Sequence, residues 1–301
     1  MPSNQAGQQT PVCDYEGSDY QQRFWDQGER EYEDRTEAIA IKRLLPTSGQ
    51  RLLEVGAGAG RNTPRYQGYE QIVLMDYSTT QLEQARERLG DSERYIYVAA
   101  DVYRLPFADG LFDGATMIRV LHHMADAPAA LASIRQTLAP GATFLLEYAN
   151  KRNFKAILRR LLGRQDWNPF SREPIEFIEL NFNFHPAAVR GWLRELGLRV
   201  QRQLTVSHFR VGLLKRTVPT ALLVALDSVF QPTGNLWQYT PSVFVKSQAD
   251  ERVAAAAPGV FFKCPQCGSP LPEKNKTHIE CGSCGSRWGY QNGIYNFKEA
   301  L

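Results

Sequence analysis

The chain has 301 residues and a formal net charge of +3. This length suits one large domain together with a second, much smaller one. So small a net charge does not by itself indicate nucleic-acid binding. No apolar stretch reaches the length of about 20 residues that crosses a bilayer. The polar N-terminus also lacks an apolar signal core, so we expect a cytoplasmic protein without a transmembrane segment.

Residues 1–48 are expected to form an N-terminal tail and helices that precede the first strand. The apolar residues between Arg35 and Leu45 recur with the period of a helix. Pro46 and Gly49 follow at the positions where a helix ends.

The stretch from Leu52 to Arg61 predicts a buried strand that runs into a glycine-rich turn and then a helix. Glycine tolerates positive φ and lets the backbone approach a ligand closely. A dinucleotide-binding turn needs G-x-G-x-x-G, but its third glycine position is Arg61 here, and Gly60 comes one place early. Glu54 would aim a carboxylate at the turn, which suits a ligand with an ammonium and a sulfonium better than a pyrophosphate.

A second acid, Asp76, ends the next apolar run and is expected beside the glycine turn, at the carboxyl edge of a parallel sheet. Ser78 to Gln81 form a capping box, which predicts an amphipathic helix through Leu89. The next strand, Tyr95 to Ala100, delivers Asp101 at its tip.

Strands and helices then continue to alternate, which predicts an α/β fold with a parallel sheet. Pro140-Gly141 is expected to end the helix that Asp126 begins, before the fifth strand. The later expected elements are strands at Phe112 to Ile118, Ala142 to Tyr148, Leu198 to Val206 and Ser242 to Ser247, and helices at Pro186 to Leu196 and Val211 to Phe230.

An insert at about 150–184 begins with a basic helix, Lys151 to Arg164, which carries apolar residues on one face. Such a helix can lie on an anionic membrane surface or meet an acidic partner. The ordinary alternative is a helix that packs on one side and is solvated on the other.

A linker, residues 248–259, separates this region from a C-terminal domain, residues 260–301. Four of the five cysteines form two C-x-x-C pairs there: Cys264, Cys267, Cys281 and Cys284. In a chain without a secretory signal this spacing favours zinc over disulfides, and four thiolates make a closed, structural site. Cys13 stands alone and is expected to be a bystander.

The motif E-x-G-x-G-x-G from Glu54 to Gly60, followed by Asp76, resembles the first motifs of class I S-adenosylmethionine (SAM)-dependent methyltransferases. The F-D-x-x-x strand and the x-V-L-H-H segment after it resemble the small-molecule, quinone-biosynthesis-like branch. The resemblance implies a Rossmann-like seven-stranded sheet over residues 49–247. It also implies a set of SAM-binding residues: Glu54, Gly56, Ala57, Gly58, Gly60, Asp76, Tyr77, Asp101, Val102 and Arg119.

Within this set, the glutamate and glycines would hold the methionine part of SAM, Asp76 the ribose, and Asp101 and Val102 the adenine. His122 and His123 lie at a strand's carboxyl end and are the candidates for a general base, against the alternative that they only pack there. In this family the helices before the first strand often cover the active site. Three aromatic residues are therefore candidate substrate contacts, against simple packing onto the sheet: Tyr20, Trp25 and Tyr32.

The C-terminal residues around the cysteines, including Trp288 and Gly293 to Phe297, resemble the small zinc-ribbon domain that activates several tRNA, rRNA and protein methyltransferases as a separate subunit. The resemblance implies a supporting or substrate-presenting role for the ribbon.

We therefore predict a SAM-dependent methyltransferase with structural zinc that acts on a small-molecule acceptor, apolar molecules being candidates. One alternative is an RNA (tRNA or rRNA) methyltransferase that uses the ribbon and the basic helix to bind its substrate; nucleic acid is the less favoured partner. The other is a non-catalytic SAM-binding or zinc scaffold.

Overall fold

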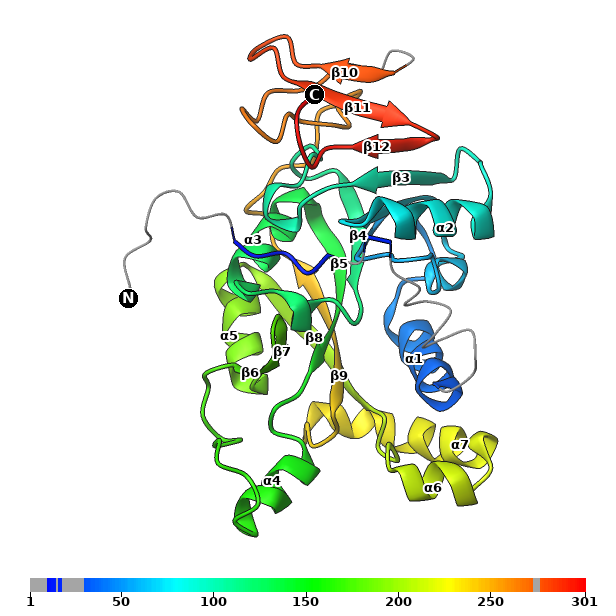
Figure 1. Cartoon of the computed structure of the whole chain (residues 1–301), viewed down its shortest axis with the longest axis vertical. Coiled ribbons are helices and arrows are strands. Elements are labelled where there is room, and N and C mark those ends of the chain that lie inside the picture. The colour runs from blue at the N-terminus through cyan, green and yellow to red at the C-terminus, as the bar shows by residue number, and fades with distance from the viewer. Residues whose placement is uncertain (1–9, 15, 18–29, 273–276) are drawn as a thin grey trace.

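The computed structural model describes residues 10–14, 16–17, 30–272 and 277–301. A ten-stranded sheet runs through the molecule in the order β10-β11-β12-β3-β2-β1-β4-β5-β9-β8 (Figure 1). The seven strands from β3 to β8 in this order form the predicted Rossmann-like sheet, which confirms the predicted fold class. These strands are β1 (Gly49–Val55), β2 (Tyr69–Asp76), β3 (Tyr95–Ala99), β4 (Phe112–Met117), β5 (Leu138–Ala149), β8 (Leu198–Val206) and β9 (Ser242–Ala249).

Helices cover both faces of this sheet. The longer helices are α1 (Glu31–Leu44), α2 (Thr79–Leu89), α3 (Ala127–Thr137), α4 (Phe154–Leu161), α5 (Pro186–Glu195) and α7 (Thr220–Phe230), and α6 (Gly212–Thr217) is shorter. Leu52 packs in one apolar core with residues of α1 and α2, and Leu53 packs in another with residues of α3 and α5. Successive strand residues thus enter opposite cores, which explains why the strand reads as a continuous apolar run.

The first five strands, β1 to β5, are parallel, and β9 is antiparallel to its neighbours β5 and β8. The chain order reverses between β1 and β4, which lie side by side. In open α/β sheets ligands bind at the carboxyl ends of the strands at such a switch point. The fold therefore places a crevice next to the glycine turn that follows β1.

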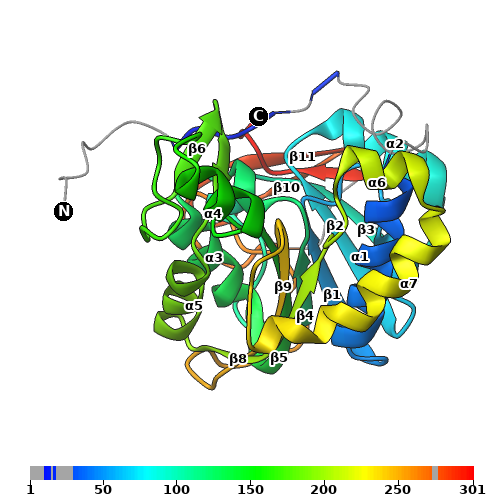
Figure 2. The ribbon, with the colours of Figure 1, turned by 90° about the horizontal axis from the view of Figure 1, so that it is seen from below.

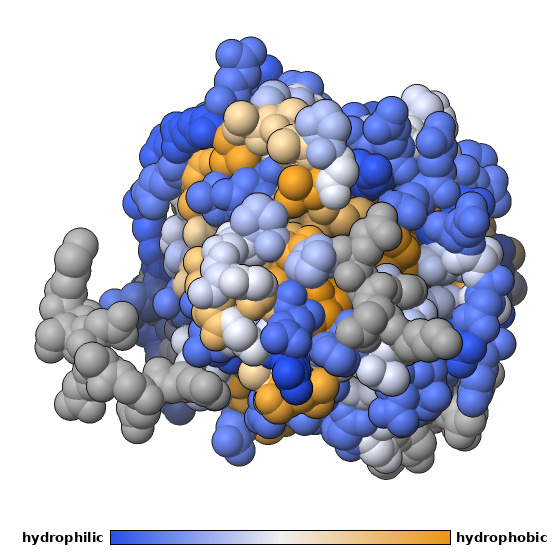
Figure 3. Space-filling view, turned by 90° about the horizontal axis from the view of Figure 1, so that it is seen from above, coloured by the Kyte–Doolittle hydropathy of each residue, from blue (hydrophilic) through white to orange (hydrophobic). Residues whose placement is uncertain are grey.

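The C-terminal residues extend the same sheet. β12 (Ile294–Asn296) pairs in parallel with β3, and β11 (Arg287–Gln291) and β10 (His278–Glu280) continue outward from it. We call residues 260–272 and 277–301 the ribbon; it forms the upper end of the molecule in Figure 1. Seen from above, the molecule has a hydrophilic margin around a central band of apolar residues (Figure 3).

Several sequence predictions about elements were wrong. The helix predicted after the glycine turn is only a short 3₁₀ helix, η2 (Thr63–Arg65), before β2 begins. Pro140-Gly141 does not precede β5 but lies within it, because the pairing of β5 with β4 shifts register between Phe112 and Gly114 and accommodates the extra residues. The helix predicted from Val211 to Phe230 is two helices, α6 and α7. Pro219 follows an extended Val218, as expected for a residue before proline, and so interrupts the helix.

The insert after β5 contains α4 and a hairpin of β6 (Ile175–Ile178) and β7 (Asn181–Asn183). The helix is shorter than predicted, because Asn153 caps its start by accepting from the Ala156 amide. Short 3₁₀ helices, η2 (Thr63–Arg65), η3 (Val102–Arg104), η4 (Leu121–His123) and η5 (Gln231–Asn235), complete the fold. In the described part of the chain no helix is both long and apolar enough to cross a bilayer.

Candidate active site

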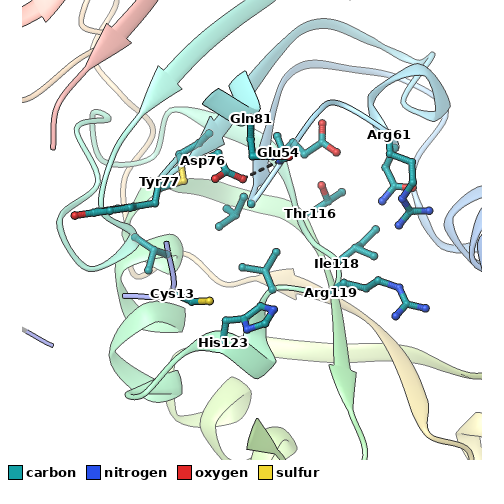
Figure 4. Close-up of a pocket in the computed structure, with 18 of the residues that line it drawn as sticks. Cys13, Glu54, Arg61, Asp76, Tyr77, Gln81, Thr116, Ile118, Arg119 and His123 are labelled. Atoms are coloured by element: carbon teal, nitrogen blue, oxygen red, sulfur yellow. Dashed lines mark hydrogen bonds between the residues drawn. The ribbon is translucent and has the colours of Figure 1, made fainter. Parts of the chain in front are cut away.

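A pocket opens where the switch point predicts it. Its walls come from the ends of β1, β2 and β4 and the segments that follow them. Val12 and Cys13, from the N-terminal part of the chain, also line it. Figure 4 shows carboxylates of Glu54 and Asp76 above the pocket, with His123 and Cys13 below it. The polar or charged residues that line it are Cys13, Glu54, Arg61, Asn62, Tyr66, Asp76, Tyr77, Gln81, Thr116, Arg119 and His123.

The glycine turn is shaped by left-handed backbone. Gly56, Gly58 and Gly60 have φ of 66°, 54° and 72°. A Cβ on Gly56 would lie 2.2 Å from Cγ2 of Val120, so a side chain there also has no room. Both the conformation and the packing therefore require glycine at the first position of the turn.

Asp76 fastens this turn to the end of β2. Its Oδ2 accepts a hydrogen bond from the Gly58 amide at 2.8 Å, and its Oδ1 accepts from the Ser78 amide at 2.9 Å (Figure 4). Burial raises the pKa of the carboxyl group, while the backbone donors favour its charged form. Each carboxylate oxygen can accept more than one hydrogen bond, so Asp76 keeps capacity for ligand hydroxyls.

Glu54 lies at the base of the pocket in a buried polar network. Its carboxylate accepts from the Thr63 hydroxyl at 2.6 Å and from the Tyr66 hydroxyl at 3.2 Å. Burial raises its pKa to about 7, against the two hydrogen bonds that lower it. A cationic ligand group beside Glu54 would favour the ionised carboxylate.

The adenine-side residues are only partly brought together. Val102 and Tyr77 line the pocket. Asp101 does not appear among the described lining residues; its Oδ1 accepts from the Tyr103 amide at 2.9 Å and caps η3. The Lys298 ammonium of the ribbon lies 5.1 Å from the centre of the Tyr77 ring. The ribbon thus contacts a residue that lines the pocket.

His123 and His122 occupy different positions although they are neighbours in η4. His123 lines the pocket, and its Nδ1 lies 3.1 Å from the Leu180 carbonyl oxygen. A carbonyl can only accept, so Nδ1 carries the proton and Nε2 is the basic nitrogen. Burial lowers the pKa of both imidazoles, which keeps them neutral near pH 7.

The Leu180 carbonyl is presented by an unusual backbone conformation. Leu180 has φ of 53° in the turn of the β6–β7 hairpin. A left-handed residue other than glycine costs about 1–2 kcal/mol, so the surrounding structure must hold it in place. The insert after β5 thereby sets the tautomer of a pocket histidine.

Arg119 connects the pocket to helix α1. Its φ is 59°, and its amide donates to the Glu147 carboxylate at 2.9 Å. Its guanidinium binds Glu37 of α1, which also pairs with Arg61 at 3.1 Å. The two arginines hold the pKa of the fully buried Glu37 below its usual range.

Tyr32 is buried against α7 and does not line the pocket. Its hydroxyl donates to the Asp227 carboxylate at 2.6 Å, which also accepts from the His208 amide at 2.7 Å. Tyr20 and Trp25, the other aromatic candidates, lie outside the described residues.

Several pocket residues were not identified from the sequence. Thr116 and Gln81 belong to elements that were predicted correctly, and Arg61 lies in the turn between β1 and η2, but no binding motif marks these three residues. Cys13 was expected to be a bystander, and yet it lines the pocket. Only tertiary structure brings residue 13 next to η4, so no local signal could have found it.

The four ribbon cysteines converge. Their sulfur atoms all lie within 4.8 Å of one another, and the pairs Cys264–Cys284 and Cys267–Cys281 are 3.7 and 3.5 Å apart. Tetrahedral zinc with bonds of about 2.3 Å separates its sulfurs by about 3.8 Å, so the donor set fits the metal.

The two cysteine turns also share one backbone pattern. In each, the first cysteine accepts from the glycine four residues later, at 2.8 Å for both Gly268 and Gly285. Both glycines have positive φ, 76° and 75°. The repeat places two equivalent thiol pairs face to face.

The comparisons with known proteins agree with this fold. Residues 53–146 match a family model described as a methyltransferase domain. An O-methyltransferase, cnsE of Penicillium expansum, is 38% identical over 35% of this chain and 40% of its own length. The ubiquinone/menaquinone biosynthesis C-methyltransferase UbiE of Saccharophagus degradans is 32% identical over 35% of this chain and 46% of its own length. The chain thus spans less than half of these relatives.

Solved structures resemble the fold over more of the chain. A complex between the Haloferax volcanii Trm112 methyltransferase activator and a putative methyltransferase matches with a TM-score of 0.52 and 20% identity, over 75% of this chain and 93% of that one. A SAM-dependent methyltransferase from Mesorhizobium loti matches with a TM-score of 0.52 and 19% identity, over 71% and 97%. The strand order and the glycine turn are those of a Rossmann-like fold, and residues 53–146 within it match a methyltransferase domain.

Proposed function

We propose that the protein transfers a methyl group from SAM to a small-molecule acceptor. The observation that carries this proposal is the pocket at the β1/β4 switch point, where the glycine turn, Glu54 and Asp76 converge. Bound SAM would supply a sulfonium whose methyl group is already activated for displacement. The protein's task is then to bind and orient two molecules, which contributes most of the rate in such a reaction.

Each part of the pocket has a proposed role. Glu54 would attract the ammonium of the methionine part, and the amides of the glycine turn would face its carboxylate. Asp76 would accept hydrogen bonds from ribose hydroxyls. Tyr77 and Val102 would flank the adenine, and we retain Asp101 as a candidate for its amino group, a role that requires a shift towards the pocket.

Replacing Asp76→Asn tests the cofactor site. The substitution removes the charge but preserves the size, and it weakens hydrogen bonds that contribute about 1.5–3 kcal/mol each when charged. We expect calorimetric titration to show SAM and S-adenosylhomocysteine binding about tenfold to a hundredfold more weakly. Glu87→Gln, an exposed acid on α2, is the matched control. Wild-type affinity in Asp76→Asn would contradict the site.

The acceptor is proposed to be a small molecule methylated on oxygen or carbon, since both kinds of enzyme are among the relatives. A hydroxyl acceptor must lose a proton. His123 is the proposed general base, because it lines the pocket with Nε2 as its basic nitrogen and stays neutral near pH 7.

Replacing His123→Gln tests this role, with quinones and phenols as first acceptors. We expect kcat to fall about 10²-fold or more while the Kd for SAM stays unchanged. His122→Gln, one residue away and not lining the pocket, should lower kcat much less. Equal kcat in His123→Gln and wild type would remove the base from the mechanism.

The ribbon is proposed to hold a structural zinc through Cys264, Cys267, Cys281 and Cys284, with no ligand position left for water. A structural neighbour is titled as a complex with a methyltransferase activator. We propose that the ribbon supports the methyltransferase domain within one chain, through β12 on β3 and Lys298 beside Tyr77. Metal analysis should find about one zinc per chain, and no zinc in a Cys264→Ser/Cys281→Ser variant.

A further inference from the structure

Large apolar side chains are exposed mainly at one end of the molecule. Among the described residues, every large hydrophobic side chain that is exposed lies between residues 154 and 239, apart from Leu301. Most belong to α4, to α6 and α7, and to the segment after η5. Figures 1 and 2 place these elements at the same end, opposite the ribbon.

The helix α4 turns its apolar face to solvent. Phe154, Leu158, Leu161 and Leu162 are 67%, 44%, 74% and 57% exposed, and their spacing places them on one face. The buried residue is Ala156, 4% exposed, which lies about 200° around the helix from both Phe154 and Leu158. The helix therefore packs on the rest of the protein through the face that carries Ala156.

The helix α7 repeats this arrangement with the same spacing. Leu222, Leu226, Val229 and Phe230 are 51%, 40%, 71% and 46% exposed. Its inward face buries Leu223 and Val224 as well as Asp227, which binds Tyr32 and His208. The outward face of a surface helix normally carries polar residues, so both helices depart from this rule by exposing apolar side chains at one end of the molecule.

A connecting segment joins the two helices into one surface. Leu236, Trp237 and Tyr239 follow η5 and are 76%, 61% and 42% exposed. The Phe154 amide donates to the Tyr239 carbonyl at 2.8 Å, and the Arg152 guanidinium lies 5.5 Å from the Tyr239 ring centre. We call the exposed apolar residues of α4, α7 and this segment the apolar end.

Positive charge lies beside the apolar end. Residues 151–164 contain six basic residues and no acidic one. The exposed cations Lys155, Arg159 and Arg164 form no ion pair with any other described residue. Lys155 and Arg159 are four residues apart and lie together on one side of the apolar face of α4, and Arg164 follows the end of the helix. Arg216 of α6 adds an exposed cation near α7.

We propose that the apolar end docks on an anionic phospholipid bilayer, with apolar side chains at the acyl boundary and the flanking cations at the headgroups. Both features are needed by helices that lie in the membrane interface, and negative lipids attract such cations. A second copy of the chain is the less suitable occupant, because a symmetric contact would bring the same basic flanks together.

Vesicle sedimentation with the full chain tests the proposal. The probes are vesicles of phosphatidylcholine alone and of phosphatidylcholine with about a third phosphatidylglycerol, a composition chosen for negative surface charge. We expect binding to the anionic vesicles, weakened by salt, and little binding to the neutral ones. Equal binding to both vesicles, or none to the anionic ones, would overturn the proposal.

Matched variants locate the docking surface. Leu161→Glu and Val229→Glu change side chains that are 74% and 71% exposed, so they should fold normally and bind about tenfold or more weakly. Leu301→Glu changes a residue 79% exposed at the other end and should bind as wild type. Arg159→Gln should weaken binding about fivefold, whereas Arg194→Gln on the exposed side of α5 should not.

Two further readouts separate the occupants. If the apolar end inserts, tryptophan emission should shift to the blue on anionic vesicles, and Trp237→Phe should lose most of that shift. A chain that is dimeric without lipid and becomes monomeric in Leu161→Glu, with no vesicle binding, would assign the surface to a second copy and overturn the proposal. An acidic protein captured where vesicles fail would overturn it as well.

Discussion

At the residue scale, the carboxyl group of Glu54 should link pH to both stability and the proposed SAM binding. Burial raises its pKa from 4.5 to about 7. A raised acid pKa contributes stability that is complete below the unfolded value and is lost as pH rises through the folded value. The protein without cofactor should therefore lose this contribution between about pH 4.5 and 7.

We expect the melting temperature of Glu54→Gln to be less dependent on pH across this window than that of wild type. The amide keeps the shape and cannot ionise. SAM affinity should show the opposite trend in wild type, increasing as pH rises towards 7, because the ammonium needs the carboxylate. Thermal scans and titrations from pH 5 to 8 measure both. Parallel pH curves for the two proteins would show that another group titrates.

Residue-level prediction succeeded where a residue type is tied to one local conformation. Gly56 needs both positive φ and space, and Asp126 accepts from the Ala129 amide as a helix cap should. The positions of other residues depend on tertiary packing, which the sequence does not reveal. Asp101 is used as a cap for η3, Tyr32 is turned towards Asp227, and Cys13 is brought to the pocket from far along the chain.

At the element scale, β12 connects the proposed zinc site to the candidate SAM pocket. The Phe297 amide donates to the Ala99 carbonyl at 2.7 Å, at the end of β3 and just before Val102. A metal bound by the four thiols would fix the two cysteine turns that precede β10 and β11. The proposed zinc would therefore act on the position of a pocket wall that contains none of its ligands.

Removing zinc with a chelator should weaken SAM binding and lower the melting temperature of the whole chain. We expect the Kd for SAM to rise several-fold, with recovery when zinc is restored. Lys298→Met, which keeps the ribbon and removes the charge over Tyr77, should reproduce a smaller part of the effect. Unchanged SAM affinity after full loss of zinc would show that the ribbon is independent of the pocket.

Element boundaries followed local chemistry, and they were misplaced where pairing overrode it. The strand Leu198–Val206 agrees with its prediction, because turn residues bound an alternating pattern. Pro140 could not be placed inside a strand from sequence, because the register shift that accommodates it belongs to the pair of strands. Pro219 indicates a helix break, but the apolar residues on both sides of it favoured the prediction of one continuous helix.

At the scale of the whole molecule, the ribbon and the sheet share a core. Phe262 lies 5.9 Å from Phe107, which precedes β4, and 5.0 Å from Phe297 of the ribbon, measured between ring centres. Both cysteines that are buried, Cys264 and Cys281, belong to the same apolar cluster as residues of the central strands. The predicted linker at 248–259 therefore separates two regions of the sequence that pack into one core.

Phe262→Ala should destabilise the whole chain by about 3–5 kcal/mol, the usual cost of removing a buried aromatic ring. Because the sheet is continuous, calorimetry should show one transition at a lower temperature rather than a small early one. Phe170→Ala, at a ring that is 53% exposed, is the control. Two separate transitions, with only the smaller one shifted, would show that the ribbon unfolds independently.

By pairing with β12, β3 ceases to be the last strand of its sheet. Its sequence, Tyr95–Ala99, is aromatic and β-branched, and an edge of this kind invites other chains to add strands in register. The ribbon ends instead in β10, three residues long and carrying His278 and Glu280. The C-terminal residues thus protect the edge of β3 from pairing with other chains. A chain shortened before residue 260 would expose this edge and should aggregate more readily.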